Sequence, residues 1–94
     1  MEDIDMKREN KKFYAFIMTT SYNDNNDKKE IIYRDYISED DALTRMKAEY
    51  FVQRERYESQ GDAISESCLR PERRYGWLST DSGIHIEMKV EMWS

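Results

Sequence analysis

The chain has 94 residues, of which 37% are charged and 38% are hydrophobic, and its formal net charge is −5. This length allows one sheet and one helix to share a core but excludes two separate cores, so we expect a single domain. Seven Tyr, three Phe and two Trp supply bulky side chains that disordered chains generally lack, which favours a folded protein.

The sequence lacks the patterns of export or membrane insertion. Its longest charge-free run, residues 13–23, is well short of the roughly 20 apolar residues that a membrane-spanning helix needs. Cys68 is the only cysteine, which excludes an intrachain disulfide and a cysteine-rich metal site and suits a reducing compartment. We therefore expect a soluble, cytoplasmic protein.

The N-terminal third predicts an arm followed by a hairpin. Residues 1–11 mix charges without an apolar period, so we expect a flexible arm before a single α+β domain over residues 12–94. Aromatic and β-branched residues on both parities from Phe13 to Tyr22 predict a central strand. Residues 23–27, Asn-Asp-Asn-Asn-Asp, predict a turn. A calcium loop of EF-hand type fails on spacing, because Lys28 stands where glycine is required, and we expect no metal site.

A second strand is predicted from Glu30 to Ile37. Its apolar alternation, Ile31, Tyr33 and Ile37, is interrupted by Asp35. A shift of one residue moves every side chain of a strand to the other face. The sequence therefore leaves open which parity of this strand faces the core.

The segment from Ser38 to Ser59 carries the clearest helical signal. Ser38 is a preferred N-cap residue, and the acids at 39–41 lie where the helix dipole favours negative charge. Gly61 follows as a stop signal. At helical spacing, one stripe of the helix should be buried: Ala42, Leu43, Met46, Tyr50, Gln53 and Tyr57.

The C-terminal third predicts a loop and a second hairpin. Residues 60–70 have no sustained period and should form a loop, and residues 72–80 should form a strand. Residues 81–83, Asp-Ser-Gly, predict a turn, and strict alternation over 84–93 predicts a strand with one buried face. The expected architecture is ββαββ, with a four-stranded antiparallel sheet packed on one face by the helix of residues 38–59.

No set of residues announces catalysis. Nucleophilic hydrolases need a nucleophile beside a base, which is most often histidine. His85 is the only histidine and falls on the predicted polar face of the last strand, with no motif around it. The glycines at 61, 76 and 83 form no phosphate-binding loop. We therefore expect a protein without enzymatic activity and without a cofactor.

The negative charge is concentrated in one segment. Residues 22–41 contain seven acids and three bases. An acidic surface attracts a basic protein partner, such as a groove that otherwise holds nucleic-acid phosphates. The alternative is that the acids at the helix start complement the dipole and the others are ordinary solvated turn residues. The candidate partner-binding acids are Asp24, Asp27, Glu30, Asp35, Glu39, Asp40 and Asp41.

Three apolar residues fall outside the predicted core. Phe51 and Val52 lie off the buried helix stripe, and Trp93 lies on the polar parity of the last strand. Exposed side chains of this kind suit anchors for a protein partner or for a homodimer, and the N-terminal arm is the alternative cover for the Phe51 and Val52 pair.

A second set of residues alternates basic and aromatic character: Arg70, Arg73, Arg74, Tyr75 and Trp77. Aromatic residues on a sheet with arginines beside them stack single-stranded bases and neutralise phosphates. Nearby glutamates and the negative net charge oppose this interpretation, and the shared parity of the two aromatic residues also fits core packing.

The acidic, tyrosine-rich profile without a catalytic set resembles the small phage and mobile-element proteins that block host machinery, including anti-CRISPR inhibitors. The resemblance covers size and composition and no motif. Together these features predict a small non-enzymatic protein-binding module, an inhibitor or regulator that docks an acidic, nucleic-acid-mimicking face on a basic site. The alternative is a single-stranded nucleic-acid-binding domain that uses the basic and aromatic set.

Overall fold

A computed structural model of the chain describes residues 13–22 and 28–93, with the side chains of residues 34 and 35 left out. The predicted arm at 1–11 and the predicted turn at 23–27 lie outside these ranges. The elements are β1 (Phe13–Tyr22), β2 (Lys28–Tyr36), α2 (Glu39–Ser59), β3 (Ile64–Arg70), the 3-10 helix η1 (Pro71–Arg73), β4 (Tyr75–Thr80) and β5 (Ile84–Trp93).

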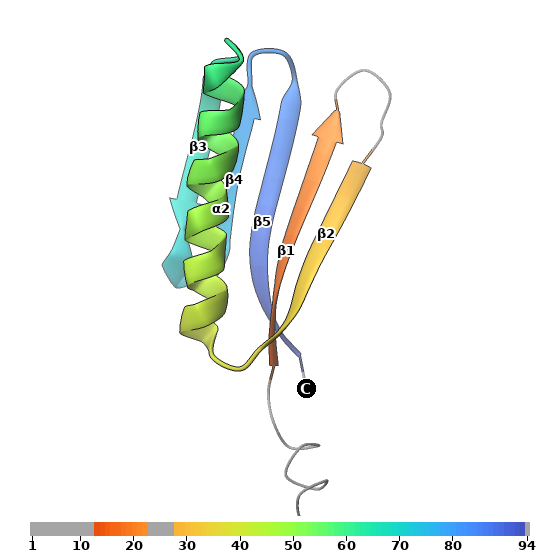
Figure 1. Cartoon of the computed structure of the whole chain (residues 1–94), viewed down its shortest axis with the longest axis vertical. Coiled ribbons are helices and arrows are strands. Elements are labelled where there is room, and N and C mark those ends of the chain that lie inside the picture. Colours follow the sequence, from red (N-terminus) through yellow and green to blue (C-terminus); the bar gives the residue numbers. More distant parts are fainter. Residues whose placement is uncertain (1–12, 23–27, 94) are drawn as a thin grey trace, which may run out of the picture.

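The strands form a five-stranded sheet in the order β2-β1-β5-β4-β3, and each neighbouring pair is antiparallel. Helix α2 lies along one face of this sheet and leads the chain from β2 at one edge to β3 at the other (Figure 1). The predicted α+β architecture, with one helix on an antiparallel sheet, is confirmed. β1 is an interior strand, as predicted.

The predicted number of four strands is wrong, because residues 64–70 form β3 and not a loop. Ile64 pairs with Thr80 while Glu66 pairs with Ser79, so β3 accommodates one extra residue between them. Ile64 and Leu69 consequently pack on the helix side although they have opposite parity. This bulge removes the period of two by which a strand is identified in a sequence.

A second bulge, in β2, explains which residues of that strand face the core. Tyr33 pairs with Phe16 and Tyr36 pairs with Tyr14, so three steps along β2 match two steps along β1. Tyr33 and Tyr36 therefore both pack against the core despite their opposite parity. Odd residues face the helix before the bulge, and an even residue does so after it.

Two predicted strand boundaries also need correction. The second strand ends at Tyr36 because Ile37 leaves the sheet, and the Ile37 side chain is 72% exposed. The strand predicted from residue 72 begins at Tyr75, since Pro71 starts η1 and Arg74 ends it in the left-handed conformation at φ 56°. Proline lacks an N–H and suits the first turn of a helix better than a paired strand.

Helix α2 forms as the sequence predicts. The Ser38 hydroxyl oxygen accepts a hydrogen bond of 3.0 Å from the backbone N–H of Asp41, so Ser38 is the N-cap. Gly61 follows the helix with φ 82°, a conformation that favours glycine. The predicted stripe faces the sheet, with Ala42, Met46, Tyr50, Gln53 and Tyr57 buried and Leu43 packed against the core.

The core fills the space between α2 and the sheet. β5 alternates as predicted, since Ile86, Met88 and Val90 are buried while Met92, near the strand end, is 45% exposed. A Cβ atom on residue 76 would lie 3.0 Å from the Leu69 Cδ1 atom. Glycine at this position therefore leaves room for the Leu69 side chain of β3 to pack over β4. The largest fully buried side chains are Phe16, Met46, Leu78, Ile86 and Met88.

Asp62 connects the end of α2 to the turn between β4 and β5. Its Oδ1 atom accepts a hydrogen bond of 3.0 Å from the Ser82 N–H, and its Oδ2 atom accepts one of 2.6 Å from the Ser82 hydroxyl. The hydroxyl hydrogen bond, which favours the ionised form, holds the pKa of the Asp62 carboxyl below its ordinary value of 3.8.

We expect Asp62→Asn to destabilise the fold at neutral pH and to do so less at low pH. The pKa of the Asp62 carboxyl is lower in the folded chain than its value of 3.8 in the unfolded chain. The carboxylate therefore contributes fully to the stability of the fold above pH 3.8, and this contribution is lost as the pH falls through the pKa of the folded chain. Urea unfolding of both proteins at neutral pH and below pH 3.8 measures the effect. A difference in urea midpoint that is the same at all pH values would contradict it.

Candidate functional site

Two surfaces carry the residues that the sequence singles out. The outer helix surface is the exposed side of α2, whose exposed residues are Asp40, Asp41, Thr44, Lys47, Ala48, Phe51, Val52, Glu55, Arg56, Glu58 and Ser59. The open sheet face is the face of the sheet opposite α2. The register places on it the side chains of β3, β4 and β5 that alternate with those on the helix side.

The acidic segment is divided in space. Asp24 and Asp27 lie outside the described residues, as does the side chain of Asp35. Glu30 pairs with Thr19 toward the beginning of β2, whereas the acids at 39–41 form the first turn of α2, beyond the other end of β2. The six steps from residue 30 to residue 36 span roughly 20 Å of strand. Glu30 is therefore not part of the acidic group at the helix start.

The three acids at the helix start differ in their partners. The Glu39 carboxylate forms an ion pair with the Arg74 guanidinium, which lies 5.7 Å from the centre of the Tyr14 ring. This pair connects α2 to η1 and β1, so Glu39 has a structural role. Asp40 and Asp41 are exposed and form no ion pair with another described residue. Their charges are available to a partner.

An apolar patch lies farther along the same side of α2. The side chains of Phe51 and Val52 are 57% and 54% exposed, as their spacing predicts, and Ala48 beside them is also exposed. The Phe51 ring meets the Tyr50 ring edge-on, with 5.1 Å between ring centres. This contact leaves more than half of the Phe51 surface free for another molecule.

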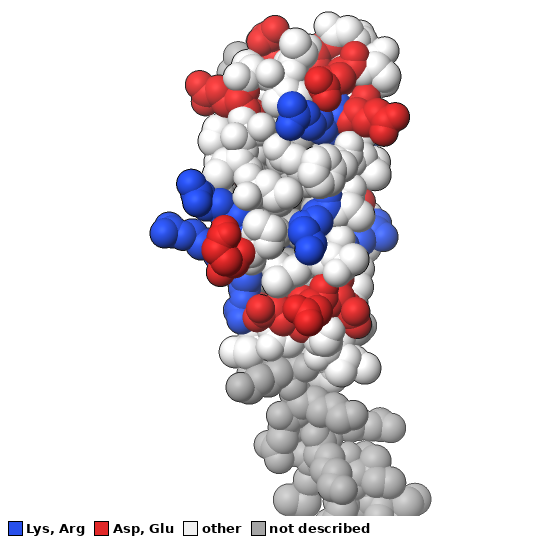
Figure 2. All heavy atoms as spheres, turned by 90° about the vertical axis from the view of Figure 1, so that its left-hand side faces the viewer, with Lys and Arg blue, Asp and Glu red and all other residues white. Residues whose placement is uncertain are grey.

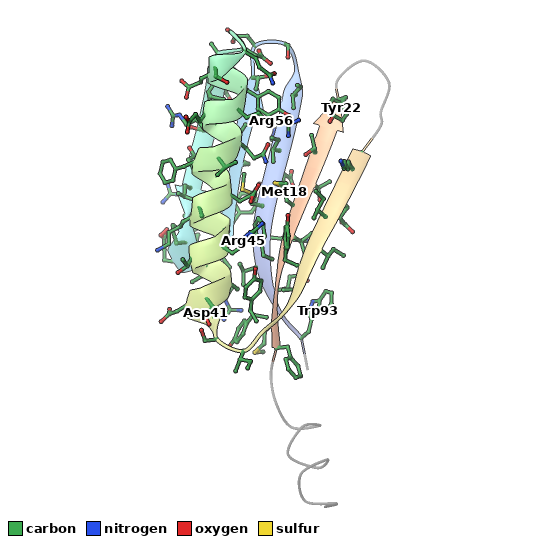
Figure 3. All side chains as sticks on the ribbon, viewed as in Figure 1. Met18, Tyr22, Asp41, Arg45, Arg56 and Trp93 are labelled. Atoms are coloured by element: carbon green, nitrogen blue, oxygen red, sulfur yellow. The ribbon has the colours of Figure 1, made fainter. Side chains whose placement is uncertain are left out.

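The figures place these features relative to one another. Figure 2 shows acidic residues gathered near the two ends of this side of the molecule, with uncharged surface and scattered charged residues of both signs between them. Asp41 lies at the beginning of α2, whereas Trp93 lies near the end of β5 and points away from the helix (Figure 3). Trp93 is half-buried and pairs with Phe13, so it does not share the outer helix surface.

The basic and aromatic set is brought together only in part. Tyr75 and Trp77 project onto the open sheet face, and Arg70 and Lys89 pair with Tyr75 from the two neighbouring strands. Burial, with a smaller effect of nearby Glu87, raises the pKa of the Tyr75 phenol.

The remaining two arginines of that set lie elsewhere. Arg74 is paired with Glu39, and Arg73 is exposed in η1. The open sheet face also carries acidic groups, because the Lys89 ammonium is 3.4 Å from the Glu91 carboxylate and Glu87 pairs with Trp77 across the strands. Its positive charge is consequently compensated locally.

His85 takes part in an array that the sequence analysis missed. Its Nδ1 atom lies 2.7 Å from the Ser79 hydroxyl, and its Nε2 atom lies 3.3 Å from the Glu87 carboxylate. The turn at 81–83 brings residues 79 and 85 opposite each other, so the sequence could have predicted this pairing from the turn. Hydrolases combine these three groups, but here the His85 and Glu87 side chains are 37% and 55% exposed, so water competes for both. The arrangement is that of surface polar contacts, one between β4 and β5 and one between neighbours on the same face of β5.

Three further observations bear on function. Within residues 13–22 and 28–93, no group of three His, Cys, Asp or Glu side chains could hold a metal ion. No helix in the described part of the chain has the length and apolar character required to cross a membrane. The chain matches no protein-family model, no curated protein and no solved structure.

Proposed function

We propose that the chain is a small non-enzymatic protein-binding module that inhibits or regulates a partner by occupying a basic site, such as one that binds nucleic acid. The outer helix surface is its docking surface. The observation that carries the proposal is the exposure of Phe51 and Val52 on the same side of one helix as Asp40 and Asp41.

The folding of the chain offers no reason for this apolar pair. Acids in the first turn of a helix stabilise it through the dipole, so their presence alone has a structural explanation. Phe and Val are poorer helix formers than Ala, and at more than half exposure they contribute little buried area. Phe51 and Val52 are therefore better explained by contact with another molecule than by the stability of α2.

The geometry suits a common mode of recognition. Asp41 and Phe51 are separated by ten helical steps, about 15 Å along the axis. Charges at the rim of an interface speed association, while apolar side chains near its centre exclude water and carry most of the affinity. Because α2 is packed on the sheet before binding, docking costs little ordering of the backbone.

The acids are tested by charge reversal. We expect Asp40→Lys with Asp41→Lys to reduce capture of the partner from host-cell extract about tenfold, because the attraction that speeds association becomes repulsion. The expected capture by the wild-type chain also weakens as salt is added. The matched control is Glu72→Lys with Asp81→Lys, which changes the net charge equally at exposed positions outside α2. Equal loss in both variants, or none in either, would contradict the proposal.

A second candidate function is binding of single-stranded nucleic acid by the open sheet face. It is favoured by the placement of Tyr75 between Arg70 and Lys89, with Trp77 on the same face. A mobility shift of a labelled oligonucleotide at low salt tests it, and loss of the shift in Trp77→Ala would support it. Docking through the outer helix surface predicts no shift.

A further inference from the structure

β3 is an edge strand with one side open. It pairs with β4 on its inner side and is the last strand of the sheet among the described residues, so its outer side presents unpaired backbone groups. The other edge strand, β2, begins with Lys28 and Lys29, which discourage pairing with a further strand, and both edge strands contain a bulge, which in β3 lies between Ile64 and Glu66 at its beginning. From Glu66 to Arg70, β3 keeps an unbroken register with β4.

The sequence of this segment is complementary to itself. Glu66, Cys68 and Arg70 share the open sheet face, since they alternate with Ser67 and Leu69, which pair with helix-side positions of β4. When two copies of β3 pair antiparallel around a two-fold axis at Cys68, Glu66 lies opposite Arg70 of the second copy, and Arg70 lies opposite Glu66. Opposite charges at directly paired positions stabilise such a ladder.

No internal ion pair competes with this arrangement. Neither Glu66 nor Arg70 belongs to an ion pair among the described residues. A register centred on Ser67 would place Glu66 opposite Cys68, and one centred on Leu69 would place Arg70 opposite Cys68, so both lose the charge pairing. The register centred on Cys68 is the one that the side chains specify.

We propose that the chain forms a two-fold symmetric homodimer through β3, in which the two sheets join edge to edge with Cys68 facing Cys68 of the second copy. The inference is independent of the proposed function. Directly opposed residues of antiparallel strands have Cα atoms about 4.5–5.5 Å apart. This separation lies within the range of about 4.4–6.8 Å that a disulfide spans, so Cys68 reports the pairing without being needed for it.

The test combines mass and cross-linking. Sedimentation equilibrium of the reduced full chain should give twice the chain mass of 11.4 kDa. Diamide should then convert the dimer to a covalent species, because it accepts two hydrogen atoms from the two thiols as one S–S bond forms. A chain that stays at 11.4 kDa and is not cross-linked overturns the proposal and leaves the β3 edge available to a strand of another protein.

Charge exchange identifies the register. Glu66→Arg and Arg70→Glu should each lower the cross-linking rate at least tenfold, since each opposes like charges, and the double exchange Glu66→Arg with Arg70→Glu should restore it. Glu72→Arg, just beyond β3, is the matched control and should cross-link like the wild type. Circular dichroism shows whether each variant is folded, and the double exchange still tests the register if one of the single variants unfolds. A cross-linking rate that is the same in all of these variants as in the wild type would overturn the proposal.

Discussion

Replacing Phe16 with Ala is expected to lower the free energy of unfolding by about 3–5 kcal/mol. Phe16 is fully buried in β1 and stacks on Tyr33, with 5.6 Å between ring centres and 16° between ring planes. Removing the ring loses its transfer free energy and leaves a cavity between the sheet and α2. Because small domains are stable by only about 5–15 kcal/mol, much of the stability of the fold would be lost.

Urea unfolding of Phe16→Ala measures this effect, with Phe51→Ala as the matched control. The two variants make the same chemical change, but Phe51 is 57% exposed, and its contact with Tyr50 is worth about 0.5–1.5 kcal/mol. Ala is also the better helix former, which offsets part of that loss. Equal loss of stability in the two variants would contradict the placement of the core.

The second large effect is expected on binding. Phe51→Ala with Val52→Ala should weaken the complex with the captured partner about 30-fold, because the loss of one apolar hot spot at the centre of an interface costs about 2 kcal/mol, which corresponds to roughly that factor. Both changes favour helix formation, which offsets part of the stability lost with the Phe51–Tyr50 contact, so the small remaining change in the stability of α2 does not account for a roughly 30-fold loss of affinity. Calorimetric titration of the purified partner gives the dissociation constants.

The control for this variant is Met92→Ala. Met92 is 45% exposed but belongs to β5 and not to α2. We expect its removal to change the affinity less than twofold. An affinity that falls equally for Met92→Ala and for the α2 variant would show that the outer helix surface is not the site of contact.

The sequence predicted the elements whose periodicity is uninterrupted. α2 and β5 combine long regular patterns with clear end signals, namely Ser38, Gly61 and the turn at 81–83, and the structure confirms both. β1 was identified by its aromatic and β-branched residues. In these segments each local preference agrees with the packing of the whole domain.

The features that the sequence did not predict have two physical causes, which are strand bulges and contacts between residues far apart in the chain. In β3 a bulge moves later apolar residues to the other parity and hides the strand period, and in β2, which was predicted as a strand, a bulge left open which parity faces the core. The pairing of Glu39 with Arg74 joins residues far apart in the chain and depends on where η1 ends, which no local pattern encodes. The same dependence on three-dimensional placement separated Glu30 from the acids of α2.

The exposed apolar pair was accessible from the sequence because it depends only on helical spacing. Once α2 is assigned, the positions of Phe51 and Val52 outside the buried stripe follow from 100° per residue. Which acids share their surface could not be predicted in the same way, since that requires the path of the chain between β2 and α2. The structure retains Asp40 and Asp41 and excludes Glu30.

The central claim is that a partner contacts the outer side of α2, and hydroxyl-radical footprinting of the chain with and without the captured partner tests it most directly. The method reports the solvent exposure of aromatic and sulfur-containing side chains individually, and Phe51, Tyr75 and Met92 are all exposed in the free chain. Docking through α2 predicts that the partner protects Phe51 and leaves Tyr75, Trp77 and Met92 as reactive as before. Protection of Tyr75 and Trp77 with unchanged Phe51 would contradict it.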